Sequence, residues 1–172
     1  FVPVTMCFLV WYNTDSEPAN ISEPTVPGTY TLRATCDNVM KMYIDGTEQQ
    51  PTSGDNSDWR QEKIFQISDS FRTIAIHCYG SGSVNGILAS LEVEGGQVIL
   101  VTDSAWKCSS MEQQGWTESE FQEDGEVWKP AVEIVKHGMS PWGVIGQISG
   151  EAKWIWDETR SDLLLPVYTA NR

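Results

Sequence analysis

The chain has 172 residues, the size of one domain, and 40% of them are apolar, which excludes an intrinsically disordered protein. Its 24 acidic and 11 basic residues give a formal net charge of −13, and no basic patch is present, so nucleic acid and anionic membrane surfaces are excluded as partners. The longest apolar run, residues 6–12, is too short to cross a bilayer, so no membrane insertion is expected.

Apolar and polar residues alternate with a period of two through most of the chain, which predicts half-buried antiparallel strands. In residues 30–37, Leu32, Ala34 and Cys36 alternate with Arg33 and Thr35. No long window has a helical period, and only residues 118–122 are predicted as a helical turn. The predicted strands span residues 1–12, 30–37, 39–44, 73–79, 86–93, 97–102, 132–135, 144–148, 152–156 and 163–168.

Short strands separated by Gly, Pro, Asn and Asp predict an all-β fold, an antiparallel jelly-roll β-sandwich of about 8–10 strands. No repeat or linker composition divides the chain, so residues 1–172 are expected to form one domain, with an N-terminal strand and loop at 1–27. The first strand is expected at a sheet edge, and the polar stretch 47–58 is expected to be a functional loop.

The four cysteines are Cys7, Cys36, Cys78 and Cys108, and their spacing fits no zinc site. An even number favours one or two disulfides, although four buried free thiols remain an alternative. Because Cys78 ends one predicted strand and Cys108 follows another, these two are expected to pair. Cys7 would then pair with Cys36 if the first strand lies against strand 30–37, but Cys7 faces away from Val2 and Val4.

Several features favour secretion into an extracellular, oxidising environment. The chain is acidic, contains cysteines in even number, and carries one glycosylation sequon, Asn20-Ile21-Ser22. Its first residue is Phe, which is consistent with removal of a signal segment. We therefore expect a secreted glycoprotein with Asn20 as the glycosylated residue.

The sequence gives little support for an enzyme. It contains no nucleophile elbow, no zinc-protease motif and no phosphate loop. The two histidines, His77 and His137, are isolated, and both are expected to be solvated. No catalytic residue and no required cofactor is therefore expected.

Nine sequence segments occur in an order that resembles a known family. They include Ala34-Thr-Cys-Asp-Asn38, Val101-Thr-Asp-Ser-Ala-Trp-Lys107 and Ala152-Lys-Trp-Ile-Trp156. This order resembles the galactose-binding-like jelly-roll modules of invertebrate secreted lectin-like proteins and of bacterial rhamnosidase-type glycoside hydrolases. The resemblance covers residues 28–168 and implies a β-sandwich. In such a module position 36 is commonly Ala, so Cys36 is a departure that suggests a disulfide partner.

Sugar sites in sandwich modules pair an aromatic ring with hydrogen-bonding side chains, and Trp residues outside the strands are the candidates. Trp106, Trp154 and Trp156 lie in or beside strands and are expected in the core, with Asp103 capping the turn before Trp106. Asp37-Asn38 is expected to form a tight link between two strands. The expected ligand-binding residues are Trp59, Arg60, Asp58, Trp116 and Trp142, and the alternative for each Trp is a plug at the sandwich end.

The acidity suggests Ca²⁺ binding as a second use. Asp45, Asp55 and Asp58, with Asn56, offer hard oxygen ligands from a loop, although their spacing matches no EF-hand. The sequence therefore predicts a secreted, non-catalytic carbohydrate-binding module whose partners are glycans or glycoproteins. The alternative is an acidic structural or adhesive matrix protein that binds Ca²⁺ or mineral through its charge alone.

Overall fold

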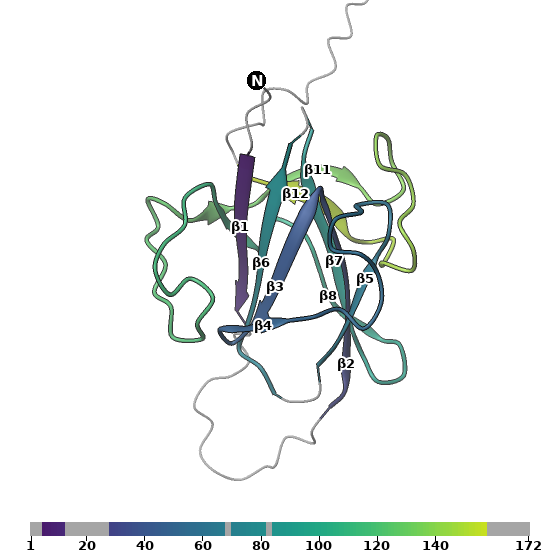
Figure 1. Cartoon of the computed structure of the whole chain (residues 1–172), viewed down its shortest axis with the longest axis horizontal. Coiled ribbons are helices and arrows are strands. Elements are labelled where there is room, and N and C mark those ends of the chain that lie inside the picture. Colours follow the sequence, from purple (N-terminus) through teal and green to yellow (C-terminus); the bar gives the residue numbers. More distant parts are fainter. Residues whose placement is uncertain (1–4, 13–27, 68–69, 82–83, 158–172) are drawn as a thin grey trace, which may run out of the picture.

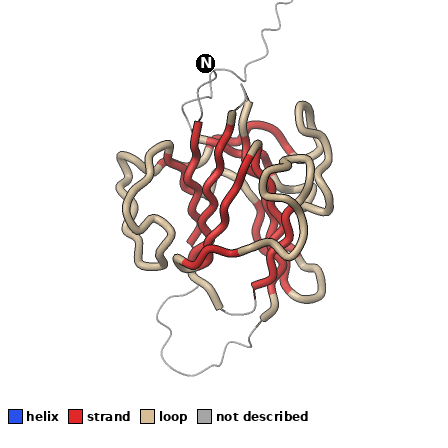
Figure 2. Tube along the Cα trace, viewed as in Figure 1, coloured by secondary structure: helices blue, strands red, loops and turns tan. Residues whose placement is uncertain are grey.

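The computed structural model describes residues 5–12, 28–67, 70–81 and 84–157, and these residues form strands, turns and loops without a helix (Figure 2). Two sheets lie face to face, which confirms the predicted all-β sandwich (Figure 1). In this described part, no helix is long and apolar enough to span a membrane.

Sheet A has six strands in the order β10-β9-β1-β6-β3-β4. Sheet B has the order β11-β12-β7-β2-β5, with β8 also paired to β7. All pairs are antiparallel, and the strands are β1 (Thr5–Tyr12), β2 (Tyr30–Asp37), β3 (Val39–Ile44), β4 (Thr47–Gln49), β5 (Lys63–Ile67), β6 (Thr73–Gly80), β7 (Gly86–Val93), β8 (Val98–Val101), β9 (Lys107–Ser109), β10 (Lys129–Pro130), β11 (Val132–Lys136) and β12 (Lys153–Trp156).

Alternation along the strands sends one set of side chains into the space between the sheets, where the main hydrophobic core forms. Strand β2 contributes Leu32, Ala34 and Cys36 to this core, and β6 contributes Ile74 and Ile76 from the opposite sheet. The expected core positions of three tryptophans are confirmed, since all three are buried: Trp106, Trp154 and Trp156. Because the core fills the space between the sheets, a ligand-binding site is expected at the loops of the sandwich ends or on the outer sheet faces.

Three predicted elements differ from the structure. The polar stretch 47–58, expected to be a loop, begins with the short strand β4 (Thr47–Gln49). Strand β1 is not at an edge, because β6 pairs with it on one side and β9 on the other. Residues 144–148 form no strand, because Gly146 has a φ of +48° and interrupts the extended backbone. The predicted strand 163–168 and the sequon residue Asn20 lie outside the described residues.

Both disulfides have partners other than those expected. The structure joins Cys7 to Cys108 and Cys36 to Cys78. Strand β1 lies between β6 and β9, with Cys78 opposite Cys7 and Cys108 opposite Leu9. Two strand spacings, roughly 9.6 Å in all, therefore separate Cys78 from Cys108, more than a disulfide can span. The expected Cys78–Cys108 pairing is wrong for this reason. The expected Cys7–Cys36 pairing is wrong because the first strand lies against β6 and β9 and not against β2.

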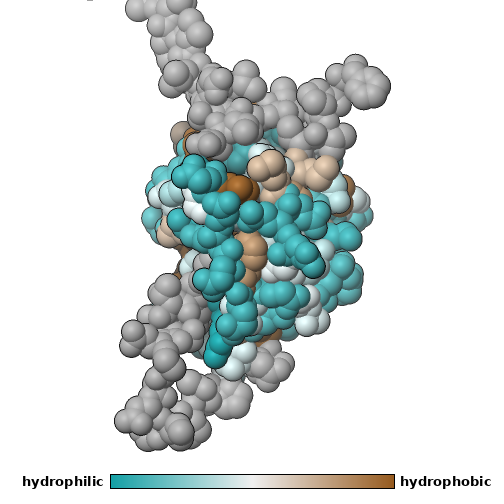
Figure 3. All heavy atoms as spheres, turned by 90° about the vertical axis from the view of Figure 1, so that its left-hand side faces the viewer, coloured by the Kyte–Doolittle hydropathy of each residue, from teal (hydrophilic) through white to brown (hydrophobic). Residues whose placement is uncertain are grey.

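The outer face of sheet A is closed by residues 110–128, here called the cover segment. Its Trp116 and Trp128 pack against Phe8 and Val10 of β1. The expected helical turn at 118–122 is a single hydrogen-bonded turn, in which Phe121 N donates to the carbonyl oxygen of Glu118. The surface on this side of the molecule is largely hydrophilic, with small apolar patches (Figure 3).

His77 of β6 lies beneath the cover segment and is only 7% exposed. Its ring stacks on Phe8, with centroids 4.4 Å apart, and meets the edge of Trp116 at 6.2 Å. Its Nε2 is buried without a hydrogen-bond partner, and burial lowers the pKa of the imidazole. The expectation of a solvated His77 is therefore wrong, because the cover segment closes the face to which this side chain points.

His137 is half-buried, and both of its ring nitrogens are hydrogen-bonded. Its Nε2 accepts a hydrogen bond from Ile145 N at 2.7 Å, and its Nδ1 donates to the Ser149 carbonyl at 3.2 Å. These two bonds join residues within the loop between β11 and β12. The ring is thus a structural anchor.

Candidate functional site

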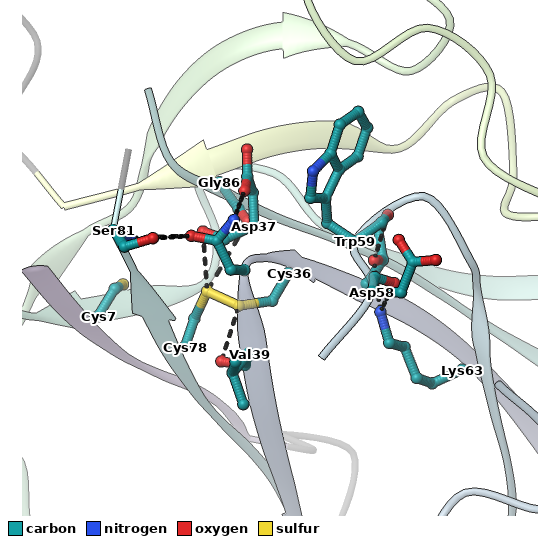
Figure 4. Close-up of a disulfide and its surroundings, with 12 residues drawn as sticks. Cys7, Cys36, Asp37, Val39, Asp58, Trp59, Lys63, Cys78, Ser81 and Gly86 are labelled. Carbon is teal, nitrogen blue, oxygen red and sulfur yellow. Dashed lines mark hydrogen bonds between the residues drawn. A yellow bond between two sulfur atoms is a disulfide. The ribbon is translucent and has the colours of Figure 1, made fainter. Parts of the chain in front are cut away.

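A group of hydrogen-bonded polar side chains lies at the end of the sandwich where β2 passes into β3 (Figure 4). Only Asn38 separates these strands, so Asp37-Asn38 forms the expected tight link, and its peptide bond is cis. Asn38 Nδ2 donates to Asp37 Oδ1 at 2.6 Å. Asn38 Oδ1 accepts from the Ser81 amide at 2.9 Å and from the Ser81 hydroxyl at 2.8 Å. The link is thereby tied to the end of β6.

The Asp37 carboxylate has a second partner from a distant part of the chain. Its Oδ2 accepts a hydrogen bond from Trp142 Nε1 at 2.8 Å. Trp142 stacks on Trp154, with ring centroids 4.3 Å apart and planes inclined by 16°. Gly86 allows this stack to approach the sheet, since a Cβ there would lie 2.7 Å from the Trp154 ring.

The charged form of Asp37 is less favourable in this environment than it would be in water. Burial raises the pKa of the carboxyl group, and the bond from Trp142, the charge of Arg60 and the bond from Asn38 oppose the rise. Each carboxylate oxygen keeps a lone pair beyond the single bond described. Asp37 is therefore a half-buried acceptor that has further hydrogen-bonding capacity.

The neighbouring loop, residues 50–62, is built on a buried lysine. Lys63 Nζ donates to the carbonyl oxygens of Asp58 at 2.6 Å and Gln61 at 3.0 Å, and to Thr35 Oγ1 at 3.0 Å. The Thr35 hydroxyl in turn donates to the Trp59 carbonyl at 2.8 Å. Burial lowers the pKa of Lys63 to about 8. These bonds fix the loop backbone against β2, directly beside the Asp37-Asn38 link (Figure 4).

This loop presents an aromatic ring and a guanidinium group. Trp59 is partly buried and packs against the cluster that contains Trp142. The Arg60 guanidinium lies over the Trp59 ring, 5.2 Å from its centroid, and the Arg60 side chain is 71% exposed. An exposed cation–π contact is worth only about 0.5–1 kcal/mol, so a ligand is able to displace Arg60 from the ring.

We call Asp37, Asn38, Trp59 and Arg60 the end site. It combines a carboxylate, an amide, an indole and a guanidinium group, which together accept and donate hydrogen bonds and offer a stacking surface. Hydroxyl-rich ligands with an apolar ring face match this set. Among these four residues, no nucleophile lies within hydrogen-bond distance of a base.

The structure brings together only some of the residues expected to bind ligand. Asp58, Trp59 and Arg60 share the 50–62 loop, and Asp58 Oδ1 accepts from the Arg60 amide at 3.0 Å. Trp142, 6% exposed, reaches the same region but contributes its N–H to Asp37. Trp116, 5% exposed, lies in the cover segment on the outer face of sheet A.

The three expected metal ligands do not form one group, because Asp45 lies away from Asp55 and Asp58, which share the 50–62 loop. Asp45 follows β3 at the end opposite Asn38, and its carboxylate accepts from the amides of Arg72 and Thr73, at 3.1 and 2.8 Å to the same oxygen. Asp55 instead caps Ser57 N at 2.8 Å. Across the part of the chain that the structure describes, no three His, Cys, Asp or Glu residues group in a way suited to a metal ion. Ca²⁺ binding thus stays a prediction without structural support.

Sequence reasoning assigned Asp37 and Asn38 only a structural role in a tight link. One sequence feature could have indicated a binding role: this link consists of two hydrogen-bonding residues with no Gly or Pro, directly after Cys36. The indole of Trp142 is 105 positions away from Asp37, so no local pattern reveals this contact.

No protein-family model and no curated protein matches this sequence. Among solved structures, the lectin of Pleurotus ostreatus in its apo form is 22% identical with a TM-score of 0.65, and the match covers 88% of this chain and 41% of the lectin. The same lectin in complex with GalNAc gives a TM-score of 0.64. The α-L-rhamnosidase of Streptomyces avermitilis, complexed with L-rhamnose, is 23% identical with a TM-score of 0.64, and the match covers 84% of this chain and 14% of the enzyme.

The chain therefore spans less than half the length of either protein. At this identity the likeness concerns the fold, and it confirms the fold that the sequence resemblance implied. This protein has the β-sandwich fold found in the matched parts of the Pleurotus lectin and the Streptomyces rhamnosidase.

Proposed function

We propose that this protein is a secreted, non-catalytic module that binds glycans or glycoproteins through the end site. The observation that carries the proposal is the half-buried Asp37 carboxylate, held by Trp142 and Asn38 beside the Trp59 ring and the Arg60 guanidinium. A carboxylate in this setting is a strong acceptor for sugar hydroxyls, and the indole suits the apolar face of a pyranose. The shared fold with a lectin crystallised with GalNAc supports this choice of ligand class.

Secretion and the absence of catalysis belong to the same proposal. Two disulfides are typical of proteins outside the reducing cytosol. The end site contains hydrogen-bonding groups without the paired nucleophile and base that acyl or glycosyl transfer needs. We therefore expect bound glycans to be released unchanged, which chromatography of the recovered ligand measures.

A glycan array with the Trp59→Ala variant tests the proposal. Wild-type protein should bind a defined set of terminal sugars, and the variant should bind them about tenfold more weakly or not at all, because the stacking surface is removed. Phe121→Ala is the matched control, since Phe121 is a partly buried loop aromatic in the cover segment, away from the end site. Folded wild-type protein that binds no glycan, or equal losses in both variants, would contradict the proposal.

The net charge favours a second candidate, an acidic structural or adhesive matrix protein. In that case binding to Ca²⁺ or mineral would depend on the summed surface charge and not on the end site. The Trp59→Ala variant would then bind as the wild type does. The dependence of binding affinity on salt concentration separates the two functions.

A further inference from the structure

The Cys36–Cys78 disulfide lies directly beneath the end site (Figure 4). Cys36 precedes Asp37 at the end of β2, and Cys78 is in β6, three residues before Ser81. The two Cα atoms are 5.9 Å apart, and both residues are fully buried. The bridge therefore joins the two chain segments from which the polar part of the site extends.

Hydrogen bonds continue this connection outward from the bridge. The Asn38 amide donates to the Tyr79 carbonyl at 2.8 Å, and the Asn38 side chain accepts two bonds from Ser81. The covalent bond and these hydrogen bonds close a ring from Cys36 through Asn38 and Ser81 to Cys78. Asp37 lies within this ring, and its position relative to Trp142 depends on the geometry of the ring.

The bridge also connects strands that are not otherwise neighbours in a sheet. Strand β2 belongs to sheet B and β6 to sheet A, so no ladder of main-chain hydrogen bonds links them. The Cys7–Cys108 disulfide differs in this respect, because its strands β1 and β9 are already paired within sheet A. Loss of Cys7–Cys108 leaves that pairing in place. Loss of Cys36–Cys78 leaves β2 joined to β6 by packing, by the bonds of Asn38 and through the chain connection to β3, which pairs with β6.

We propose that the Cys36–Cys78 disulfide is a positioning element of the end site: it fixes the Asp37 carboxylate against the Trp142 indole in the arrangement that receives a ligand hydroxyl. The ligand part of this inference rests on the proposed function. The positioning part is a property of the free protein and is measured without any ligand.

Two double variants provide the test and its matched control. Cys36→Ala/Cys78→Ala removes the bridge at the end site, and Cys7→Ala/Cys108→Ala removes the other. Chain entropy alone makes the control variant the less stable of the two, because its bridge spans 101 residues and the test bridge spans 42. A merely structural role of both bridges would therefore make every effect of the control at least as large.

Positioning predicts the opposite order at the site. In the test variant, NMR should show the Asp37 pKa moving down toward its ordinary value and about tenfold faster exchange of the Trp142 indole N–H, because the carboxylate becomes solvated. Its affinity for the glycan found on the array should fall about tenfold. The control variant should retain the wild-type pKa of Asp37. Its indole exchange rate and its glycan affinity should stay within about twofold of the wild-type values.

Equal changes in both variants, or no change at Asp37 in the test variant, overturn the proposal. If wild-type protein binds no glycan, the proposed function fails, while the Asp37 pKa and the indole exchange still decide the positioning role. If the test variant does not fold, Cys36→Ala/Cys78→Val restores part of the buried volume and is measured in the same way. Failure of this variant to fold as well would show that the bridge is needed for folding and would overturn the positioning role.

Discussion

At the scale of single residues, Asp37 combines a site role with an unfavourable environment. A carboxyl group whose pKa is raised in the folded state lowers stability at pH values above that pKa, because the unfolded chain ionises more readily. Residues retained despite such a cost are frequent at functional sites. Asp37 is therefore expected to contribute to ligand binding while lowering the free energy of unfolding.

Asp37→Asn should separate these two properties. The variant should bind glycan about tenfold or more weakly, because an amide is a poorer acceptor than a carboxylate. Its free energy of unfolding at pH 7 should change little, because removal of the half-buried charge offsets the loss of one of the two hydrogen bonds that the carboxylate accepts. Isothermal titration calorimetry measures the first effect and denaturant unfolding the second. Asp103→Asn is the control, since the Asp103 carboxylate caps Ala105 N at 2.8 Å in another turn. Unchanged binding together with a loss of stability would refute this assignment.

Residue types alone predicted part of the site and could not predict the rest. Asp58 was correctly predicted in a polar loop, and Trp59 with Arg60 beside it outside the strands, because no alternating pattern continues there. Burial of Trp116 and Trp142 depends on which surfaces their loops cover, and that is a tertiary property. The role of Asp37 likewise depends on Trp142, a contact made only after the sandwich has formed.

At the scale of elements, strict alternation was the reliable signal. Strands β2, β3 and β7 have the predicted bounds residue for residue, since each presents one apolar face to the core. Strand β5 was missed because it begins with Lys63, whose charge is accommodated only by three oxygen acceptors that the 50–62 loop and β2 supply. The short strands β9 and β10 contain too few residues for a period to be visible.

The cover segment buries His77 and thereby makes the stability of the fold depend on pH. His77 lies beneath Trp116, and burial lowers its pKa. The charge of Glu112 in the cover segment raises this pKa, and the charge of Lys41 on β3 lowers it. In the unfolded chain the imidazole titrates near 6.5. The unfolded state therefore binds more protons once the pH falls below that value, and the stability contributed by neutral His77 is lost between pH 6.5 and its folded pKa.

We expect the free energy of unfolding of the wild type to fall below pH 6.5 by up to about 1.4 kcal/mol per pH unit more than that of His77→Phe. The variant keeps an aromatic ring on Phe8 and lacks the titrating group. Urea unfolding of both proteins between pH 7.5 and 5, followed by Trp fluorescence, measures the difference. Parallel pH curves for the two proteins would show that His77 is not the responsible group.

At the scale of the whole molecule, the order of weak segments predicted the fold better than any single segment did. Nine short motifs in sequence indicated a jelly-roll sandwich, and the solved structures confirm that architecture. The disulfide pairs were not predictable in the same way, because β1 inserts between β6 and β9 far from its neighbours in the chain. Cysteine spacing carries no information about such an insertion.

Net charge is the remaining property of the whole molecule, and it decides between the two candidate functions. With a formal charge of −13, the folded protein repels itself, and salt should screen this repulsion over a Debye length of about 10 Å at 0.1 M. Raising NaCl from about 0.05 to 0.5 M should therefore raise the free energy of unfolding. Glycan affinity should stay within about twofold over the same range, because stacking and hydrogen bonds at the end site are weakly screened.

Diffuse binding of Ca²⁺ or mineral responds in the opposite way, since it depends on the screened surface potential. Its apparent affinity should fall steeply across the same salt series, and neither Trp59→Ala nor Asp37→Asn should alter it beyond the small change in charge. Surface plasmon resonance on immobilised glycan and on a Ca²⁺-loaded mineral surface compares the two cases with one protein preparation. Glycan binding that fades with salt in parallel with mineral binding would assign both to the acidic surface and would leave the end site without a ligand.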